Sequence, residues 1–238
     1  MAIIMNLTCI IIPVYNNPKT IKKVVEETLE SNFFVIVVDD GSDIEVKSLL
    51  NEHAHLVVLR HDINYGKGRA IITGAKEAKK KSFHYIITID GDGQHYPAEA
   101  ERILPLLTDK TIVIGSRRFQ ENVPFSSKFG RSFSNFWIFI ESGRWLNDTQ
   151  SGFRGYPVSI LDLDLKQSKY DFEIEVLIKH LWSKGQIKEL EINVYYPPKG
   201  TRISHFDKVK DNARLTRLHS KLVLQNIVRT LRLLSFKK

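Results

Sequence analysis

Short apolar segments alternate with segments of helical periodicity through the first half of the chain, and this alternation constrains the fold more than any other feature. Continuous apolar runs are typical of strands that are buried on both faces of a parallel sheet. Repeated strand–helix–strand units predict parallel strands joined by right-handed crossovers. We therefore expect an α/β fold with a mostly parallel sheet flanked by helices. The expected strands are Leu7–Val14, Phe34–Val38, Leu56–Leu59, Tyr85–Ile89 and Thr111–Gly115.

Helical segments lie between these strands and in the second half of the chain. The first is expected to have Asn17 as its N-cap and Pro18 in its first turn. A further strand is expected over Ile187–Tyr196, and one or two basic amphipathic helices from about Asp207 to the end. We expect one domain over residues 1–206 and a helical extension over residues 207–238. The other expected helices are Pro18–Leu29, Glu45–Glu52, Gly68–Lys80, Pro97–Leu107, Arg131–Leu146 and Asp171–Lys184.

The positive charge of the chain is concentrated in its tail. From Lys199 to Lys238 there are 11 Lys and Arg against 2 Asp and Glu, whereas the other 198 residues carry 24 against 25. Basic amphipathic helices bind anionic bilayer surfaces, but an apolar stripe can equally pack on the protein core or on a partner. The single cysteine, Cys9, lies in an apolar run and indicates a buried thiol in a reducing compartment.

Two aspartates one residue apart follow the fourth expected strand, in Asp90-Gly91-Asp92-Gly93-Gln94-His95. In open α/β sheets, ligands bind beyond the carboxyl ends of the strands. Mg²⁺ and Mn²⁺ prefer oxygen ligands and commonly bridge one or two carboxylates to phosphates. The pattern therefore indicates a divalent cation that neutralises a departing diphosphate. A polar β-turn is the alternative interpretation.

Polar residues also follow the first two expected strands, in Pro13-Val14-Tyr15-Asn16 and Asp39-Asp40-Gly41-Ser42. Adjacent carboxylates after an apolar run are costly unless they meet donors, a cation or water. The N–H and O–H groups of a base or ribose are one source of donors. An Asx turn or a helix cap is the other source, and the residues alone leave both open.

Three further loops carry candidate residues. The glycine-containing loop 64–68 precedes a helix, whose N-terminus favours anions, and Gly66 allows close backbone approach. Arg117 or Arg118 can bind a phosphate. In the segment Asp148-Thr149-Gln150-Ser151-Gly152-Phe153-Arg154, Asp148 is a candidate general base, and Arg154 can orient it or bind phosphate. The alternatives are a simple loop with a C-cap for the first, a solvated surface pair for the two arginines, and a helix-terminating turn for the third.

Taken together and in this order, these motifs resemble those of glycosyltransferase family 2, which has the GT-A fold. The resemblance points to the branch of dolichol-phosphate mannosyltransferases and bacterial polyprenyl-phosphate glycosyltransferases, and it covers roughly Thr8 to Phe206. Each motif is weak alone, but the ordered set is specific. One departure is Asn17, which stands where the family pattern P-x-Y-N-E has glutamate. The membrane-spanning C-terminal helices of many relatives are also not seen.

The resemblance implies a role for each matching residue. Arg202 would lie on a mobile loop that closes over the donor diphosphate. The residues that bind the nucleotide sugar would be Pro13, Tyr15, Asp39, Asp40, Gly66, Asp90 and Arg202. The ligands of Mg²⁺ or Mn²⁺ would be Asp90, Asp92 and Gln94. The acceptor would bind Arg117, Arg131 and Ser134, and the catalytic residues would be Asp148, Asp92 and Arg202.

The implied function is inverting transfer of a sugar from a nucleotide diphosphate sugar to a polyprenyl phosphate or similar lipid-linked acceptor. An anionic acceptor needs no strong base, so Arg117 and Arg131 would mainly position it. A glycan- or glycolipid-extending enzyme with a hydroxyl acceptor is the alternative, and there Asp148 would take the proton. A non-catalytic nucleotide-binding module is a further alternative.

Nucleic acid is not expected as a partner, because the pocket is acidic and no nucleic-acid module is present. No segment has the roughly 18 to 20 apolar residues that span a bilayer. We expect no signal peptide and a cytoplasmic protein held peripherally at the inner face of the membrane.

Overall fold

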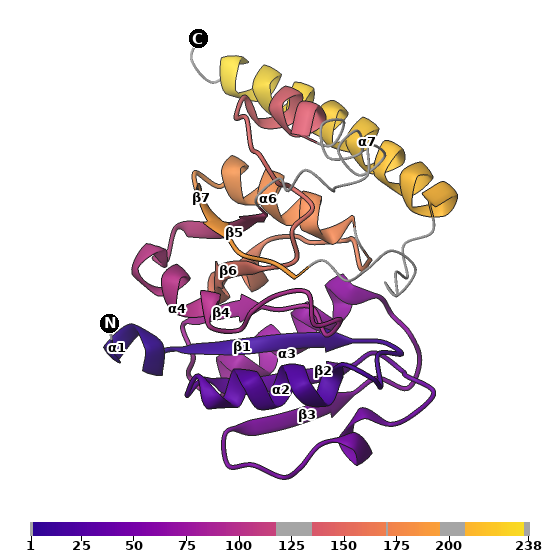
Figure 1. The fold of residues 1–238 in the computed structure, drawn as a ribbon. Coiled ribbons are helices and arrows are strands. Elements are labelled where there is room, and N and C mark those ends of the chain that lie inside the picture. The colour runs from indigo at the N-terminus through magenta and orange to yellow at the C-terminus, as the bar shows by residue number, and fades with distance from the viewer. Residues whose placement is uncertain (1, 118–134, 170, 196–207, 236–238) are drawn as a thin grey trace.

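The computed structural model describes residues 2–117, 135–169, 171–195 and 208–235 (Figure 1). Within these ranges, seven strands form one sheet in the order β3-β2-β1-β4-β6-β5-β7. The strands are β1 Thr8–Val14, β2 Phe34–Asp39, β3 Leu56–Arg60, β4 Tyr85–Thr88, β5 Thr111–Arg117, β6 Arg154–Pro157 and β7 Gln186–Ile192. The predicted α/β fold with a mostly parallel sheet is confirmed.

Strand direction decides which loops meet at each edge of the sheet. Strands β1, β2, β3 and β4 are parallel, and β5 is parallel to β7. Strand β6 is antiparallel to both of its neighbours, β4 and β5. The carboxyl ends of the six parallel strands therefore share one edge with the amino end of β6. The loop that enters β6 reaches the same edge as the loops that leave β1, β2, β4 and β5.

Helices cover both faces of the sheet because alternate residues of each buried strand point to opposite sides. Ile10 and Ile12 of β1 pack in one cluster with α2 (Ile21–Glu30) and α4 (Glu99–Ile103). Cys9 and Ile11 belong to the opposite cluster, with α3 (Lys67–Lys80) and α6 (Phe172–Trp182). Figure 1 shows α2 and α3 on opposite faces. Cys9 is the predicted buried thiol, and burial raises its pKa well above the ordinary range.

Several predicted helices are shorter than expected for local reasons. Helix α2 begins at Ile21, after a turn in which the Asn17 carbonyl accepts hydrogen bonds from Thr20 and Ile21. Helix α4 ends at Ile103 and gives way to a 3-10 turn, Leu104–Leu106. Pro105 lies in that turn, where it cannot donate a helical hydrogen bond. At the N-terminus, a short helix, α1 (Ala2–Asn6), precedes β1.

The predicted helix over Glu45–Glu52 is wrong, because only a short 3-10 helix, Val46–Leu49, forms there. The Val46 amide donates to the Asp39 carboxylate at 3.1 Å instead of continuing a helical pattern. The Ser48 hydroxyl bonds to the Glu45 carbonyl at 2.7 Å, a local bond that competes with helical pairing. A further 3-10 helix, Val158–Asp162, follows β6.

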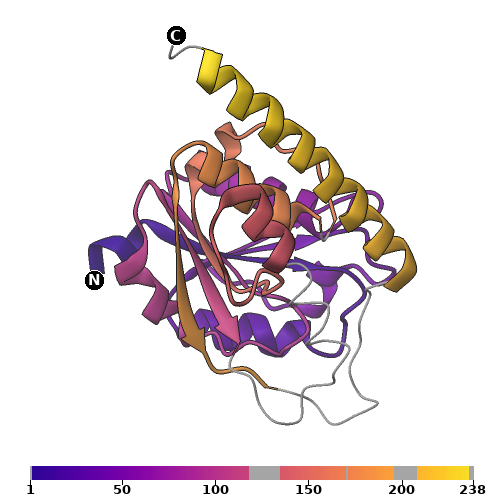
Figure 2. The same ribbon diagram turned by 90° about the horizontal axis from the view of Figure 1, so that it is seen from above.

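The C-terminal extension is a single helix, α7 (Lys208–Ser235), that packs on the body of the protein (Figures 1 and 2). Leu218 and Leu222 are buried in the same core cluster as α3 and α6. The His219 ring stacks on Trp137 with 5.7 Å between centroids, and its Nδ1 lies 2.8 Å from the Glu141 carboxylate. Trp137 and Glu141 lie on the helical segment 135–142, which is the described part of the predicted aromatic helix.

A second apolar stripe runs along the outer face of α7. Leu222 and Leu224 point in directions about 200° apart around the helix axis, and they are 1% and 64% exposed. Ile227, Val228 and Leu231 share the outward face and are each about half exposed or more. In the part of the chain that the structure covers, no helix is long and apolar enough to cross a membrane.

Replacing Leu222 with alanine should lower the free energy of unfolding by about 2–5 kcal/mol, because it leaves a cavity in the core. The matched change Leu224→Ala should alter it by no more than about 0.5 kcal/mol, because that side chain is exposed. Urea unfolding followed by tryptophan fluorescence measures both. Equal effects of the two substitutions would show that α7 does not pack on the body through this face.

Candidate functional site

An ammonium group lies between two carboxylates at the carboxyl edge of the sheet. Lys67 Nζ, at the start of α3, is 2.6 Å from Asp90 Oδ1 and 2.7 Å from Glu173 Oε1. Asp90 follows β4, and Glu173 belongs to the first turn of α6. Burial alone would raise the pKa of Asp90, but the neighbouring Lys67 charge reverses this, and the pKa of Asp90 is lowered. Asp90 is therefore a carboxylate at neutral pH.

Asp92 and Gln94 continue the turn that Asp90 begins. The backbone N–H of Gln94 donates to Asp92 Oδ1 at 3.0 Å, and the backbone N–H of Tyr195 donates to the backbone carbonyl of Gln94 at 2.8 Å. The side-chain nitrogen of Gln94 is buried and has no hydrogen-bond partner among the described residues. A buried donor of this kind indicates a missing ligand or water.

The residues of this turn fit a divalent cation that is shared with phosphate. In the described ranges, no three His, Cys, Asp or Glu side chains gather as a metal-binding group. Mg²⁺ is commonly held by only one or two carboxylates, with phosphate oxygens and water completing the shell. Asp90 and Asp92 match that arrangement. Gln94 can turn its amide to present oxygen to a cation or nitrogen to a phosphate.

His95 links this turn to a second pair of charges. Burial lowers the pKa of His95 to about 4, and the charges of Asp90, Arg117, Lys67 and Asp148 also act on it. The Arg117 guanidinium binds both oxygens of Asp148, from Nε at 2.7 Å and from Nη2 at 2.8 Å. The Arg117 backbone amide also donates to Asp148, whose side chain is fully buried. The charges of both ion pairs therefore act on one imidazole, which is neutral at pH 7.

Asp39 and Asp40 meet donors from the protein, as the turn-and-cap interpretation predicted. Asp39 accepts hydrogen bonds from the amides of Ser42 at 2.9 Å and Val46 at 3.1 Å, and it pairs with Arg60. Asp40 accepts from the amides of Tyr65 at 3.0 Å and Gly66 at 2.7 Å.

The His61 ring also lies 2.7 Å from an Asp40 oxygen. Both carboxylates of this pair are buried. Their hydrogen bonds shape the loops beside β1 and β2.

The other described residues of the predicted nucleotide site lie at the same edge. Pro13 is buried near the end of β1, and Tyr15 follows it, half-buried. Asn16 joins the loops after β1 and β2, because its backbone N–H donates to the Ser42 hydroxyl at 3.0 Å. Gly66 precedes α3 with φ of 102°, and a Cβ there would lie 2.5 Å from the Ser168 carbonyl oxygen. Its backbone thus approaches the segment that leads into α6.

The structure corrects the hypothesis that Arg154 binds phosphate or orients Asp148. Arg154 is fully buried at the start of β6. Its guanidinium donates to the carbonyls of Thr149, Ser151 and Glu173, each at 2.7 Å. This arginine holds the loop before β6 against α6. Four residues named as candidates, Arg118, Arg131, Ser134 and Arg202, lie outside the described residues.

Sequence reasoning missed Glu173 and Gly152, and it gave no role to Lys67. A Cβ built on Gly152 would lie 2.4 Å from Asp90 Oδ2 and 2.5 Å from Lys67 Nζ. A side chain there would have to displace the ends of the Asp90 and Lys67 side chains. The signal available from sequence was Gly152 within the loop 148–154, but nothing in the sequence links that loop to Asp90 or to Glu173.

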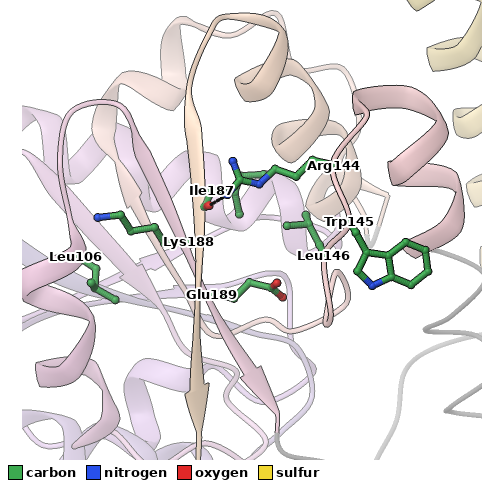
Figure 3. Close-up of a pocket in the computed structure, with 7 residues that line it drawn as sticks. All are labelled: Leu106, Arg144, Trp145, Leu146, Ile187, Lys188 and Glu189. Atoms are coloured by element: carbon green, nitrogen blue, oxygen red, sulfur yellow. Dashed lines mark hydrogen bonds between the residues drawn. The ribbon is translucent and has the colours of Figure 1, made fainter.

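A pocket lies away from these residues, beside β7 (Figure 3). It has a volume of about 250 Å³, and Figure 3 shows the Arg144 guanidinium directed at the Ile187 carbonyl, which it binds at 2.7 Å. None of the predicted site residues lines it. The lining residues are Leu106, Arg144, Trp145, Leu146, Ile187, Lys188 and Glu189.

Known proteins resemble this chain in sequence and in fold. The family model described as Glycosyl transferase family 2 matches residues 9–162. The UDP-N-acetylglucosamine–dolichyl-phosphate N-acetylglucosaminyltransferase of Methanococcus voltae is 32% identical over 216 residues, covering 80% of this chain and 86% of that protein. The undecaprenyl-phosphate mannosyltransferase of Micrococcus luteus is 29% identical over 200 residues, covering 76% and 81%.

Among solved structures, the chain resembles glucosyl-3-phosphoglycerate synthase from Mycobacterium tuberculosis in complex with Mn²⁺, uridine diphosphate and glucosyl-3-phosphoglycerate. The TM-score is 0.64 at 18% identity, and the match covers 94% of this chain and 82% of that chain. At this identity, the likeness concerns the fold.

Gly152→Ala should destabilise the protein by about 1–3 kcal/mol, because the added methyl overlaps the Asp90–Lys67 ion pair. The control is Gly91→Ala in the neighbouring turn, where the nearest atom to the added Cβ, Val14 Cγ2, lies 3.4 Å away. Thermal unfolding of both variants measures the difference. A Gly152→Ala variant as stable as Gly91→Ala would contradict the described approach of the two loops.

Proposed function

Because this chain belongs to glycosyl transferase family 2, we propose that it moves a sugar, with inversion, from a nucleoside diphosphate sugar to a polyprenyl phosphate or similar lipid-linked phosphate. The fold is the GT-A α/β fold that the sequence predicts. The observation that carries the choice of acceptor is the Arg117–Asp148 pair beside the Asp90–Asp92 turn. Both oxygens of the carboxylate that could serve as a base accept hydrogen bonds from Arg117, and the same two bonds orient the guanidinium.

The donor site is proposed at the carboxyl ends of β1, β2 and β4. Asp90, Asp92 and Gln94 would hold Mg²⁺ or Mn²⁺, which supplies Lewis-acid stabilisation of the leaving diphosphate. The nucleotide would be lined by Pro13, Tyr15, Asp39, Asp40 and Gly66. The name of the Methanococcus voltae relative includes UDP-N-acetylglucosamine, and the M. tuberculosis structure is a complex with uridine diphosphate. A UDP-sugar is therefore the first donor to test.

The acceptor is proposed to be already anionic. Both Asp148 oxygens accept hydrogen bonds from Arg117, so Asp148 serves as the anchor that orients this guanidinium. A fixed guanidinium binds phosphate through two parallel hydrogen bonds. A lipid phosphate attacks through an oxygen that carries charge at neutral pH, so no proton has to be removed. Arg131 and Ser134 are proposed to bind the same phosphate, and Arg202 the donor diphosphate.

Peripheral membrane attachment through residues 207–238 fits a lipid-linked acceptor. The outward stripe of α7 is apolar, and Arg214, Arg217 and Lys221 of the same helix are exposed. Basic amphipathic helices bury such a stripe in the headgroup region of anionic bilayers. The adjacent segment adds four more exposed apolar side chains, Phe136, Phe139, Ile140 and Trp145. We propose the inner face of the membrane as the place of this attachment.

The purified protein should transfer sugar from a UDP-sugar, beginning with UDP-N-acetylglucosamine, to a polyprenyl phosphate and not to the matching polyprenol. Asp92→Asn should lower kcat by more than about 100-fold, because the cation contributes several kcal/mol of charge stabilisation. Product analysis by mass spectrometry with Mg²⁺, Mn²⁺ or EDTA measures both. Retained transfer by Asp148→Asn would rule out an obligatory base.

Three results would contradict the proposal. They are equal or better transfer to the polyprenol, full activity of Asp92→Asn, and full activity in EDTA. The first would favour a hydroxyl acceptor, as in enzymes that extend glycans or glycolipids. A failure to turn over any nucleotide sugar would favour a nucleotide-binding module.

Serine at Leu224, Ile227, Val228 and Leu231 should reduce co-sedimentation with phosphatidylglycerol vesicles by at least about tenfold, because the apolar stripe is lost. These positions are exposed, so the fold is retained, whereas truncation at residue 207 would also remove the buried Leu218 and Leu222. A double control, Ile3→Ser with Ile44→Ser, removes exposed apolar side chains elsewhere. Unchanged binding by the α7 variant would refute the attachment.

A further inference from the structure

Lys67 occupies one side of the carboxylate that the proposed cation needs. Its ammonium is 2.6 Å from Asp90 Oδ1, and its side chain is only 16% exposed. An ammonium at this distance competes with a divalent cation for the same oxygen and repels it. A divalent cation that arrives without nucleotide must therefore displace the Lys67 ammonium, or bind beside it, before Asp90 can coordinate it.

Glu173 keeps the ammonium in the site. It binds Lys67 Nζ at 2.7 Å, and its side chain is 6% exposed. Glu173 comes from α6, far from the Asp90 turn in sequence, so the contact depends on the tertiary fold. The second carboxylate gives Lys67 a partner that remains when Asp90 turns to another cation. Because lysine is a flexible chain with three rotatable donors, its ammonium can hold Glu173 while exchanging its other partner.

The space around the ammonium is built for it. A Cβ at Gly152 would lie 2.5 Å from Lys67 Nζ, so the glycine of the loop before β6 leaves room for this side chain. Lys67 also opens helix α3, whose N-terminus favours anions. A diphosphate bound here would offer the ammonium a new partner and would bring negative charge that attracts the cation.

We propose that Lys67, held in place by Glu173, makes divalent-cation binding at Asp90 and Asp92 depend on the nucleoside diphosphate. Without nucleotide, the ammonium neutralises Asp90 and keeps the bare cation weakly bound. With the diphosphate present, the ammonium turns to the phosphates and Asp90 becomes available. Lys67 and Glu173 are thus positioning residues of the site, and this inference rests on the proposed function.

Direct titration of Mn²⁺ tests the coupling without an activity assay. Free Mn²⁺ is followed by electron paramagnetic resonance, with and without uridine diphosphate, after correction for Mn²⁺ bound by uridine diphosphate in buffer. In the unmodified protein, the nucleotide should raise Mn²⁺ affinity by about 5–150-fold, the usual range for coupled sites. Lys67→Met should bind bare Mn²⁺ at least about fivefold more tightly and should lose most of this coupling.

Glu173→Gln should change Mn²⁺ affinity in the opposite direction. Of the two carboxylates that contact the Lys67 ammonium, only Asp90 is left in this variant. The ammonium should therefore stay on Asp90, and bare Mn²⁺ should bind more weakly than in the unmodified protein. If the contact between Lys67 and Glu173 served only the fold, Lys67→Met and Glu173→Gln would both bind Mn²⁺ more weakly. The double variant Lys67→Met with Glu173→Gln removes both charges together, which spares the fold an unpaired buried carboxylate, and it should still bind bare Mn²⁺ more tightly than the unmodified protein.

The matched control is Lys80→Met, which makes the same charge change in the same helix at a side chain that is 75% exposed. It should leave Mn²⁺ affinity unchanged, and thermal unfolding confirms that each variant is folded. The inference is overturned if Lys80→Met matches Lys67→Met, or if the folded Lys67 variants keep the original affinity and coupling. These outcomes leave the proposed function intact. Absence of Mn²⁺ binding by the unmodified protein, with and without uridine diphosphate, overturns both.

Discussion

The reversed direction of strand β6 is the constraint on which the site depends. A crossover from β5 into a parallel strand would deliver the loop 148–153 to the opposite edge of the sheet. Because β6 runs antiparallel to β4 and β5, this loop enters the sheet at the edge where the other strands end. Asp148 thereby meets Arg117 at the end of β5, and Gly152 meets Asp90 after β4. Fully buried Arg154 fixes the loop through three backbone carbonyls.

Much of the sheet could be predicted because its strands are continuous apolar runs. Strand β6 could not, because Arg-Gly-Tyr-Pro has neither an apolar run nor an alternating pattern. It forms through pairing with two neighbours, which is a tertiary effect that no local pattern records. The helix expected after Asp39 failed for a related reason, because a buried carboxylate 7 residues earlier captures the Val46 amide.

The candidate site shows the same division. Asp90, Asp92 and Arg117 could be named because they follow strands, and strand ends of a parallel sheet converge. Glu173 could not, because its place beside Lys67 depends on how α6 packs against α3. Asp39 and Asp40 look alike in sequence but serve different loops, one capping the Val46 turn and the other binding the backbone before α3. Arg131, Ser134 and Arg202 remain predictions from the family resemblance.

The two apolar stripes of α7 divide its residues into two groups under different structural constraints. Substitutions at Leu218 or Leu222 are limited by the packing of the core, whereas those at Leu224 or Leu231 leave the fold unaffected. Protein engineers can therefore exchange the side chains of the outer stripe without retuning the packing of the interior, although a single helix carries both surfaces.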